Sequence, residues 1–167
     1  MIKKQLIISL IILEQRALLG RIPQDHPKRQ MIEEERKKYE AGYRGQKSVK
    51  YFLDLLPDDE YYIFHDLRLQ NNSKYFQMDA VLLITAAILI LEVKNFSGHL
   101  YFDKSHQVIR TLNDRRTCFS NPIAQVKLQA QQLNNWLKNN KLPVLPIESV
   151  VIFSNSSAII EADDSYE

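Results

Sequence analysis

The sequence has almost no capacity for covalent crosslinks, because its 167 residues include one cysteine, Cys118. A single thiol cannot form an intramolecular disulfide, and this favours a reducing compartment over the secreted, disulfide-stabilised class of protein. We therefore expect a cytoplasmic protein. The sequence also lacks internal repeats and low-complexity tracts, so repeat architectures are not indicated.

A long hydrophobic segment suited to a membrane is missing as well. The one candidate, LIISLIIL at residues 6–13, is well short of the roughly 20 apolar residues that a spanning helix needs. The following stretch, EQRALLGR, lacks the small residues of a signal-peptide cleavage site. Leu6, Leu10, Leu13 and Ala17 instead follow a helical spacing and predict a packed helix, with no membrane partner.

The sequence has no large excess of positive or negative charge, since the formal net charge is +2. This value permits a nucleic-acid partner without arguing for one, because such proteins usually carry a local basic patch. With 45% hydrophobic and 25% charged residues, the composition is that of a globular protein. We expect an N-terminal helical extension at residues 1–39 and one domain at residues 40–167. Because the sequence ends soon after a predicted core strand, a natural chain that continues past Glu167 stays an open alternative.

Prolines and glycines divide the first third of the chain. Pro23 and Pro27 predict a linker, and a new helix is predicted from about Lys28. Gly42 and Gly45 are expected to break or bend this helix. A second amphipathic stripe follows at i, i+3, i+4 and i+7 and consists of Val49, Phe52, Leu53 and Leu56. Because of its spacing to that stripe, Gln46 is predicted to project from the buried helix face.

Several strands and one more helix complete the pattern. Strands are predicted at 61–69, at about 77–84 and 87–94, after Gly98, and in the stretches QVIRTLN and IESVVIFSN. A helix is predicted from Pro122 with an apolar stripe of Ile123, Val126, Ala130, Leu133 and Leu137. This order of elements predicts an α/β or α+β fold in which helices flank a mixed β-sheet.

Charged residues occur inside the two most apolar predicted strands. If residues 77–84 and 87–94 form a hairpin, Asp79 lies opposite Glu92 and Gln77 opposite Lys94. Opposed side chains have Cβ atoms about 5 Å apart, so the two carboxylates would repel each other. A divalent cation offsets that repulsion, and Mg²⁺ prefers one or two carboxylates plus water and phosphate oxygens. Lys94 shares the face of Glu92 and could contact the attacking water or a phosphate.

A simpler interpretation stays open: Lys94 could form an ordinary ion pair with either acid at a frayed hairpin end. The position of the three residues favours a site, because Ile88, Ile90 and their neighbours make both strands apolar on both faces. Such strands are central in a sheet, and α/β ligand sites occur at the ends of central strands.

Five blocks of sequence resemble the nuclease-related domain (NERD) family, a branch of the PD-(D/E)XK restriction-endonuclease-like superfamily. They are AGYRGQKSV, FHDLRL, QMDAVLL, LEVKNFSG and NPIAQVKLQ, in the family's order and over residues 40–155. The resemblance implies a restriction-endonuclease-like central sheet and Mg²⁺- or Mn²⁺-dependent hydrolysis of DNA. It also implies that Asp79, Glu92 and Lys94 are catalytic, that the carbonyl of Val93 binds metal, and that Gln125 contacts substrate or orients the site.

One residue departs from the family pattern. The first block normally ends in glutamate, and this chain has Gln46 there. An amide can coordinate a metal or hold a water, but it carries no charge and cannot act as a base. Two hypotheses follow: a DNA-processing nuclease with Gln46 as a secondary polar ligand in the catalytic site, or a catalytically weakened module that binds nucleic acid or a protein partner.

The remaining polar residues carry weaker signals. Arg110, Arg115 and Arg116, with Lys104, could form a phosphate-contacting rim or an ordinary solvated hairpin tip. His65 on an aromatic strand is typical of a hydrogen-bonded structural residue. The N-terminal helices are expected to dock on the core or on a partner, because the apolar run at residues 6–13 should not stay exposed. Nothing in the sequence indicates an oligomeric state.

Overall fold

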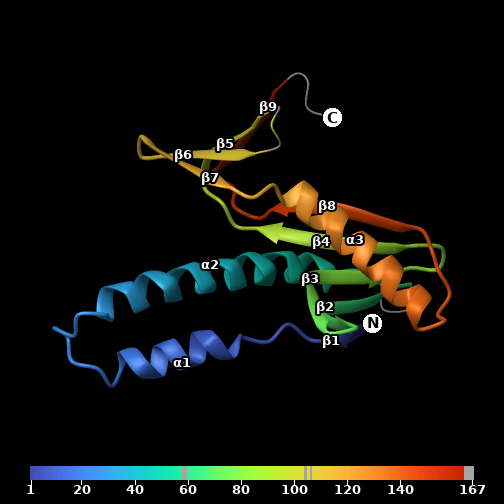
Figure 1. The fold of residues 1–167 in the computed structure, drawn as a ribbon, viewed down its shortest axis with the longest axis horizontal. Helices are drawn as coiled ribbons and strands as arrows, with labels where there is room; N and C mark the ends of the chain where they lie inside the picture. The colour runs from blue at the N-terminus through green and yellow to red at the C-terminus, as the bar shows by residue number, and fades with distance from the viewer. Residues whose placement is uncertain (58–59, 104, 106, 164–167) are drawn as a thin grey trace.

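A computed structural model describes residues 1–57, 60–103, 105 and 107–163 and has two mixed sheets and three helices (Figure 1). The larger sheet has the strand order β1-β2-β3-β4-β8, and the smaller sheet has the order β7-β6-β5-β9. The strands of the larger sheet are β1 (Ile2–Lys4), β2 (Tyr62–Asn71), β3 (Lys74–Leu83), β4 (Ile88–Lys94) and β8 (Ile147–Phe153). Those of the smaller sheet are β5 (Gly98–Phe102), β6 (Val108–Leu112), β7 (Arg115–Phe119) and β9 (Ala158–Ala162). The predicted mixed α/β class is confirmed.

The helices are α1 (Leu10–Leu19), α2 (Arg29–Leu53) and α3 (Pro122–Asn139). Helices α2 and α3 cover opposite faces of the larger sheet, because alternate residues of its central strands pack against different helices. Val81, Ile88 and Ile90 join the cluster that contains α3, whereas Leu82 and Leu91 join the cluster that contains α2. This double coverage explains why the two strands are apolar on both faces.

The central hairpin has the register that the sequence predicts. Strands β3 and β4 are antiparallel, with Leu83 opposite Ile88 and Ala80 opposite Leu91. The main-chain nitrogen of Ile84 donates to the carbonyl of Ala87 at 3.0 Å and closes the hairpin. Because paired residue numbers keep a constant sum in an antiparallel ladder, Asp79 and Glu92 occupy the positions just past the last pair. Both acids therefore sit where the hairpin ends.

The expected break in the second helix is wrong, since α2 runs without interruption from Arg29 to Leu53. Gly45 has a different role from the one predicted. A Cβ atom at this position would lie 2.8 Å from the Cβ of Asn95 and 2.8 Å from the Oγ of Ser154. The lack of a side chain thus lets α2 pack closely against the segments that follow β4 and β8.

The N-terminal segment differs from the predicted packed helix over residues 6–17. Residues Ile2–Lys4 form the edge strand β1, which pairs in parallel with β2, and α1 begins only at Leu10. The α1 side chains that become buried are Ile12 and Gln15, whereas Leu10 and Leu13 are exposed. Helix α1 packs on α2, where the Nε2 of Gln15 donates to Glu35 at 3.1 Å. No helix in the described part of the chain is long and apolar enough to cross a membrane.

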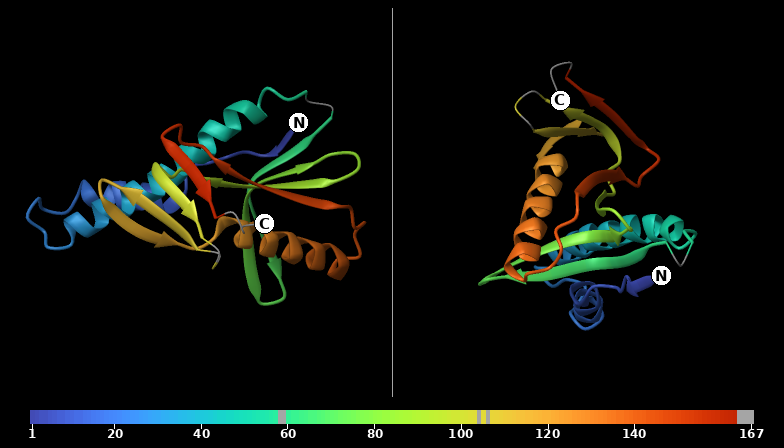
Figure 2. Two further views of the ribbon diagram at one scale, coloured as in Figure 1. Left: turned by 90° about the horizontal axis from the view of Figure 1, so that it is seen from above. Right: turned by 90° about the vertical axis from the view of Figure 1, so that its right-hand side faces the viewer.

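The smaller sheet stands at the end of the central strands (Figure 2). Strands β5 and β6 form the predicted hairpin, and β7 extends it, while β9 pairs in parallel with β5. Neither β7 nor β9 was predicted from the sequence. A separate cluster built around Leu100, Phe102 and Val108 includes Ile123 of α3 and Phe153 of β8. This contact ties the smaller sheet to the part of the molecule that holds the acids.

Candidate active site

Asp79 is held where β3 and β4 separate. One carboxylate oxygen, Oδ2, accepts a hydrogen bond from the main-chain nitrogen of Val93 at 2.8 Å. Strand β4 uses alternate peptide groups on its two sides, and the carbonyl of Lys94 is bonded to Ser154 beside β8 at 3.0 Å. The main-chain N–H and carbonyl of Val93 consequently face the β3 side. There the Asp79 carboxylate accepts the hydrogen bond that a main-chain carbonyl of β3 would accept in a regular ladder.

The second oxygen of Asp79 is bonded from helix α2. The Nε2 of Gln46 donates to Oδ1 at 2.6 Å, so the predicted inward projection of Gln46 agrees with the structure. Burial, and next the negative charge of Glu92, raise the pKa of Asp79 to about 6. The hydrogen bonds from Val93 and Gln46 and the charge of Lys94 act in the opposite direction. The carboxyl group therefore titrates near neutral pH, which is a property common in functional sites.

Glu92 lies on β4 and faces helix α3. Its side chain is buried, and its two oxygens accept from different donors: Lys94 Nζ at 2.7 Å and Gln129 Nε2 at 2.8 Å. The ammonium group of Lys94 also donates to Oε1 of Gln125 at 3.0 Å. The ion pair that the simpler interpretation expected is present, and it lies inside a larger polar network.

Helix α3 contributes a residue that the sequence analysis missed. Gln129 is buried, and its Nε2 bonds both the carboxylate of Glu92 and the carbonyl of Gln77, the latter at 3.0 Å. A signal for it existed in the sequence, because Gln129 falls three residues after Val126 and four before Leu133 on the apolar stripe. A polar residue on a buried helix face requires a partner, and here the partner is the acid on β4.

The two acids approach the hairpin end from different surroundings, because Asp79 is bonded from α2 and Glu92 from α3. Each of their four oxygens accepts one hydrogen bond from the protein. A carboxylate has about four acceptor sites, so each oxygen retains a lone pair for another ligand. The described residues contain no group of three or more His, Cys, Asp or Glu side chains that could hold a metal ion. Asp79 and Glu92 are the two described carboxylates at the hairpin end that could act as ligands of a cation.

Other polar residues that the sequence analysis considered lie elsewhere. His65 is buried on β2, and burial, followed by the charge of Lys50, lowers its pKa, but its Nε2 has no hydrogen-bond partner in the described part of the chain. This differs from the expectation that the imidazole is hydrogen-bonded. Cys118 is exposed on β7. The arginines of β6 and β7 form a separate surface, and Lys104 lies outside the described residues.

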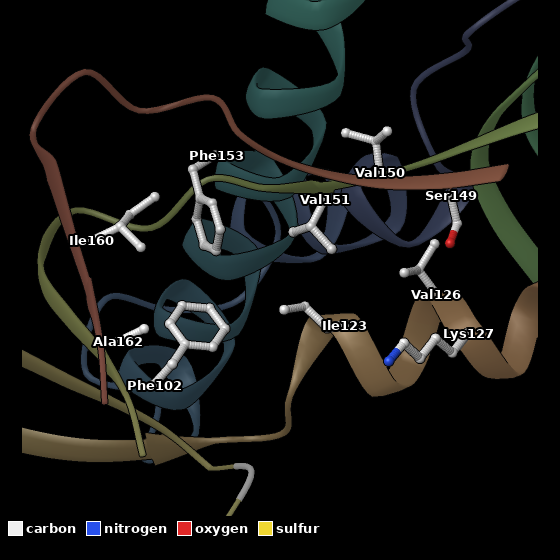
Figure 3. A pocket seen from close by; sticks show the side chains of 10 residues that line it. All are labelled: Phe102, Ile123, Val126, Lys127, Ser149, Val150, Val151, Phe153, Ile160 and Ala162. Carbon is white, nitrogen blue, oxygen red and sulfur yellow. The ribbon is translucent and has the colours of Figure 1, made fainter. Parts of the chain in front are cut away.

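A hollow of about 490 Å³ lies between α3, β8 and the smaller sheet (Figure 3). Its walls are mostly apolar and include Phe102, Ile123, Val151, Phe153 and Ile160. Among the described residues that line it, Lys127 alone is charged. The described residues that line this hollow include none of the carboxylates found at the end of the central hairpin.

A model of the nuclease-related domain family matches residues 41–154, which is more than half of the chain. The matched range contains every residue of the polar network just described. No curated protein and no solved structure matches the chain.

Proposed function

The chain belongs to the nuclease-related domain family, and from this premise we propose that it is a metal-dependent nuclease that hydrolyses phosphodiester bonds in DNA. The observation that carries the proposal is that Asp79 accepts a hydrogen bond from Val93, which stands in β4 between the ion-paired residues Glu92 and Lys94. The negative charge of Glu92 helps to raise the pKa of Asp79, and the ammonium group of Lys94 is ion-paired with Glu92.

The residues proposed to hold the cation are Asp79 and Glu92, together with the main-chain carbonyl of Val93. This carbonyl faces the β3 side of β4, toward Asp79, because its neighbours on the strand bond to β8. When bound, Mg²⁺ or Mn²⁺ polarises a phosphoryl oxygen and lowers the pKa of the attacking water.

The other members of the network hold the charged groups in position. Glu92 and Gln125 both accept from Lys94 and fix its ammonium group near the acids, where it can donate to water or to the scissile phosphate. Gln129 fixes the carboxylate of Glu92 by bonding its second oxygen. Gln125 is thus proposed to orient Lys94, and Gln129 to orient Glu92.

Cleavage of plasmid and single-stranded DNA with Mg²⁺ or Mn²⁺ tests this proposal directly. We expect the wild type to cleave only when a divalent cation is present. Lys94→Ala should reduce cleavage by roughly two to four orders of magnitude, as expected when a proton donor or a charge-stabilising group is removed. Equal cleavage by the variant, or a wild type that never cleaves, would contradict the proposal.

A second candidate function is favoured by the contact between Gln46 and Asp79. The amide donates a hydrogen bond to a carboxylate oxygen and adds no negative charge, so the site attracts a cation less strongly than one with a third carboxylate. The alternative is a weakened site on a domain that binds nucleic acid or a protein partner without cutting.

Gln46→Glu distinguishes the two candidates. If the variant gains cation binding and cleavage that the wild type lacks, the natural protein is the weakened form. If the wild type cleaves and the variant changes the rate only modestly, the natural protein is the nuclease. If the variant and the wild type both bind DNA and neither cleaves it, the protein is a binding module without nuclease activity.

A further inference from the structure

A hollow on the β6–β7 hairpin is lined mainly by hydrogen-bond donors, and no acid is among the described residues that line it. It has a volume of about 530 Å³, and Arg110, Leu112, Asn113, Arg115 and Thr117 line it. Two guanidinium groups, an amide and a hydroxyl group are the side chains that proteins use to bind phosphate oxygens. The chemistry of this hollow is therefore that of an anion site.

The pairing of the two strands explains why these groups share one face. Arg110 lies opposite Thr117, and Leu112 lies opposite Arg115. Because side chains alternate along a strand, Arg116, which lies opposite Thr111, points to the other face. The hairpin thus carries arginines on both faces, and only one face has the hollow.

Neither arginine of the hollow pairs with an acid in the part of the chain that the structure describes. No ion pair between described residues involves Arg110, Arg115 or Arg116. The guanidinium group of Arg110 rests over the ring of Phe119, with its Cζ 4.9 Å from the ring centroid, and its buried Nε has no hydrogen-bond partner among the described residues. Stacking holds this group in one place while it leaves donors available.

The hollow is connected to the candidate active site through short segments. Arg110 also lies 6.0 Å from the ring centroid of Phe96, which follows Lys94 by two residues. Phe119 precedes Asn121, which caps α3, the helix that carries Gln125. Figure 1 shows the β6–β7 hairpin standing out from the body of the molecule on the side where β4 ends and α3 begins. A chain of phosphates in the active site could continue onto this hairpin.

We propose that the Arg110–Arg115 face of the β6–β7 hairpin binds the phosphate backbone of the nucleic-acid substrate next to the active site. This inference rests on the proposed function for the identity of the polymer. The contacts would be made to phosphates and would carry no base specificity, because backbone contacts position a nucleic acid without reading its sequence. The other source of the same chemistry is a free phosphate or a mononucleotide.

Binding of a fluorescein-labelled DNA oligonucleotide in EDTA tests the inference without requiring cleavage. Arg115→Gln should weaken binding roughly three- to tenfold and lower the slope of log K against log salt by about 1, as expected for one lost phosphate contact. Arg110→Gln should do the same. Arg116→Gln is the matched control, since it removes the same charge from the other face of the same hairpin, and it should bind as the wild type does.

Three results would overturn the inference. The first is an Arg116→Gln variant that loses as much affinity as Arg115→Gln, and the second is an Arg115→Gln variant that binds like the wild type. The third is a mononucleotide or inorganic phosphate that competes as strongly as the oligonucleotide, which would indicate a site for a free anion. Arg115 is exposed, so its variant should fold even if the stacked Arg110 proves structurally required. The two proposals can fail separately. If the protein never cleaves DNA but Arg115→Gln weakens binding and Arg116→Gln does not, the proposed nuclease activity is contradicted and the proposed phosphate-binding face is supported.

Discussion

Replacing Gln46 with glutamate tests the balance of charge at the hairpin end. The Nε2 of Gln46 donates to Asp79 at 2.6 Å, so the substitution brings a third carboxylate to the hairpin end, against that of Asp79. Two unit charges about 4 Å apart repel by about 4 kcal/mol at an effective dielectric of about 20. In the absence of a cation, the variant should therefore be less stable than the wild type.

The loss has an upper limit because Asp79 can take up a proton. Its pKa is about 6 in the folded protein, so protonating it at pH 8 costs about 3 kcal/mol, which is less than the repulsion. The protonated acid can then donate to the new glutamate. Without metal, Gln46→Glu should reduce the free energy of unfolding by about 3 kcal/mol at pH 8 and by about 0 kcal/mol near pH 6.

Urea unfolding with and without Mg²⁺ measures both parts of this prediction. Trp136, the one tryptophan, packs against the core cluster beneath α3 and provides the fluorescence signal. Mg²⁺ should stabilise the variant more than the wild type, because a third carboxylate adds ligand charge. Gln131→Glu, the same substitution at an exposed position of α3, is the control and should show neither effect.

The reasoning would be refuted by either of two results. If Gln46→Glu is as stable as the wild type at pH 8 without metal, the third carboxylate does not lie against Asp79. If Mg²⁺ shifts the unfolding midpoints of the variant and the wild type equally, the three acids do not share a cation.

Three further predictions concern the same region. The folded pKa of Asp79, about 6, lies above its ordinary 3.8, so the folded state binds the proton more tightly, and stability should fall by a total of about 3 kcal/mol as pH rises from well below 3.8 to well above the folded value; Asp79→Asn should abolish this dependence in urea unfolding at a series of pH values. Gly45→Ala should lower the free energy of unfolding by about 1–3 kcal/mol, because its new Cβ would lie 2.8 Å from that of Asn95, and an unchanged denaturation midpoint would be inconsistent with the close packing. Lys94→Met should destabilise the fold by about 3–5 kcal/mol, because it leaves the buried carboxylate of Glu92 without its cation; a loss below 1 kcal/mol in the same assay would show that the pair is solvated.

The central hairpin could be predicted in detail because its constraints are local. The apolar runs around Ala80 and Leu91 determine two strands, and the short turn between them fixes the register. The positions of Asp79 and Glu92, just beyond the last pair of Ala80 and Leu91, follow from that register. Helix α3 was equally accessible, since Asn121 caps it and the Oδ1 of this residue accepts from Ile123 at 2.8 Å.

The parts that the sequence did not predict depend on contacts distant in the chain. Gly45 resembles a helix breaker until the neighbouring Asn95 and Ser154 are known, because close packing and helix breaking both favour glycine. Strand β9 pairs with β5 across a large separation in sequence, and no local pattern identifies such a partner. In α1, one helix face contains Leu10 and Leu13 and another contains Ile12, and both are apolar. The face with Ile12 is buried because α2 packs against it.

The proposed function depends most directly on whether Asp79 and Glu92 bind a divalent cation together. Calorimetric titration of the wild type and of Asp79→Asn with Mn²⁺ and Mg²⁺ measures this binding without relying on cleavage. We predict that the wild type binds a cation at a single site and that Asp79→Asn loses this site while remaining folded. Binding that is absent from the wild type, or equal in the two proteins, would contradict the account.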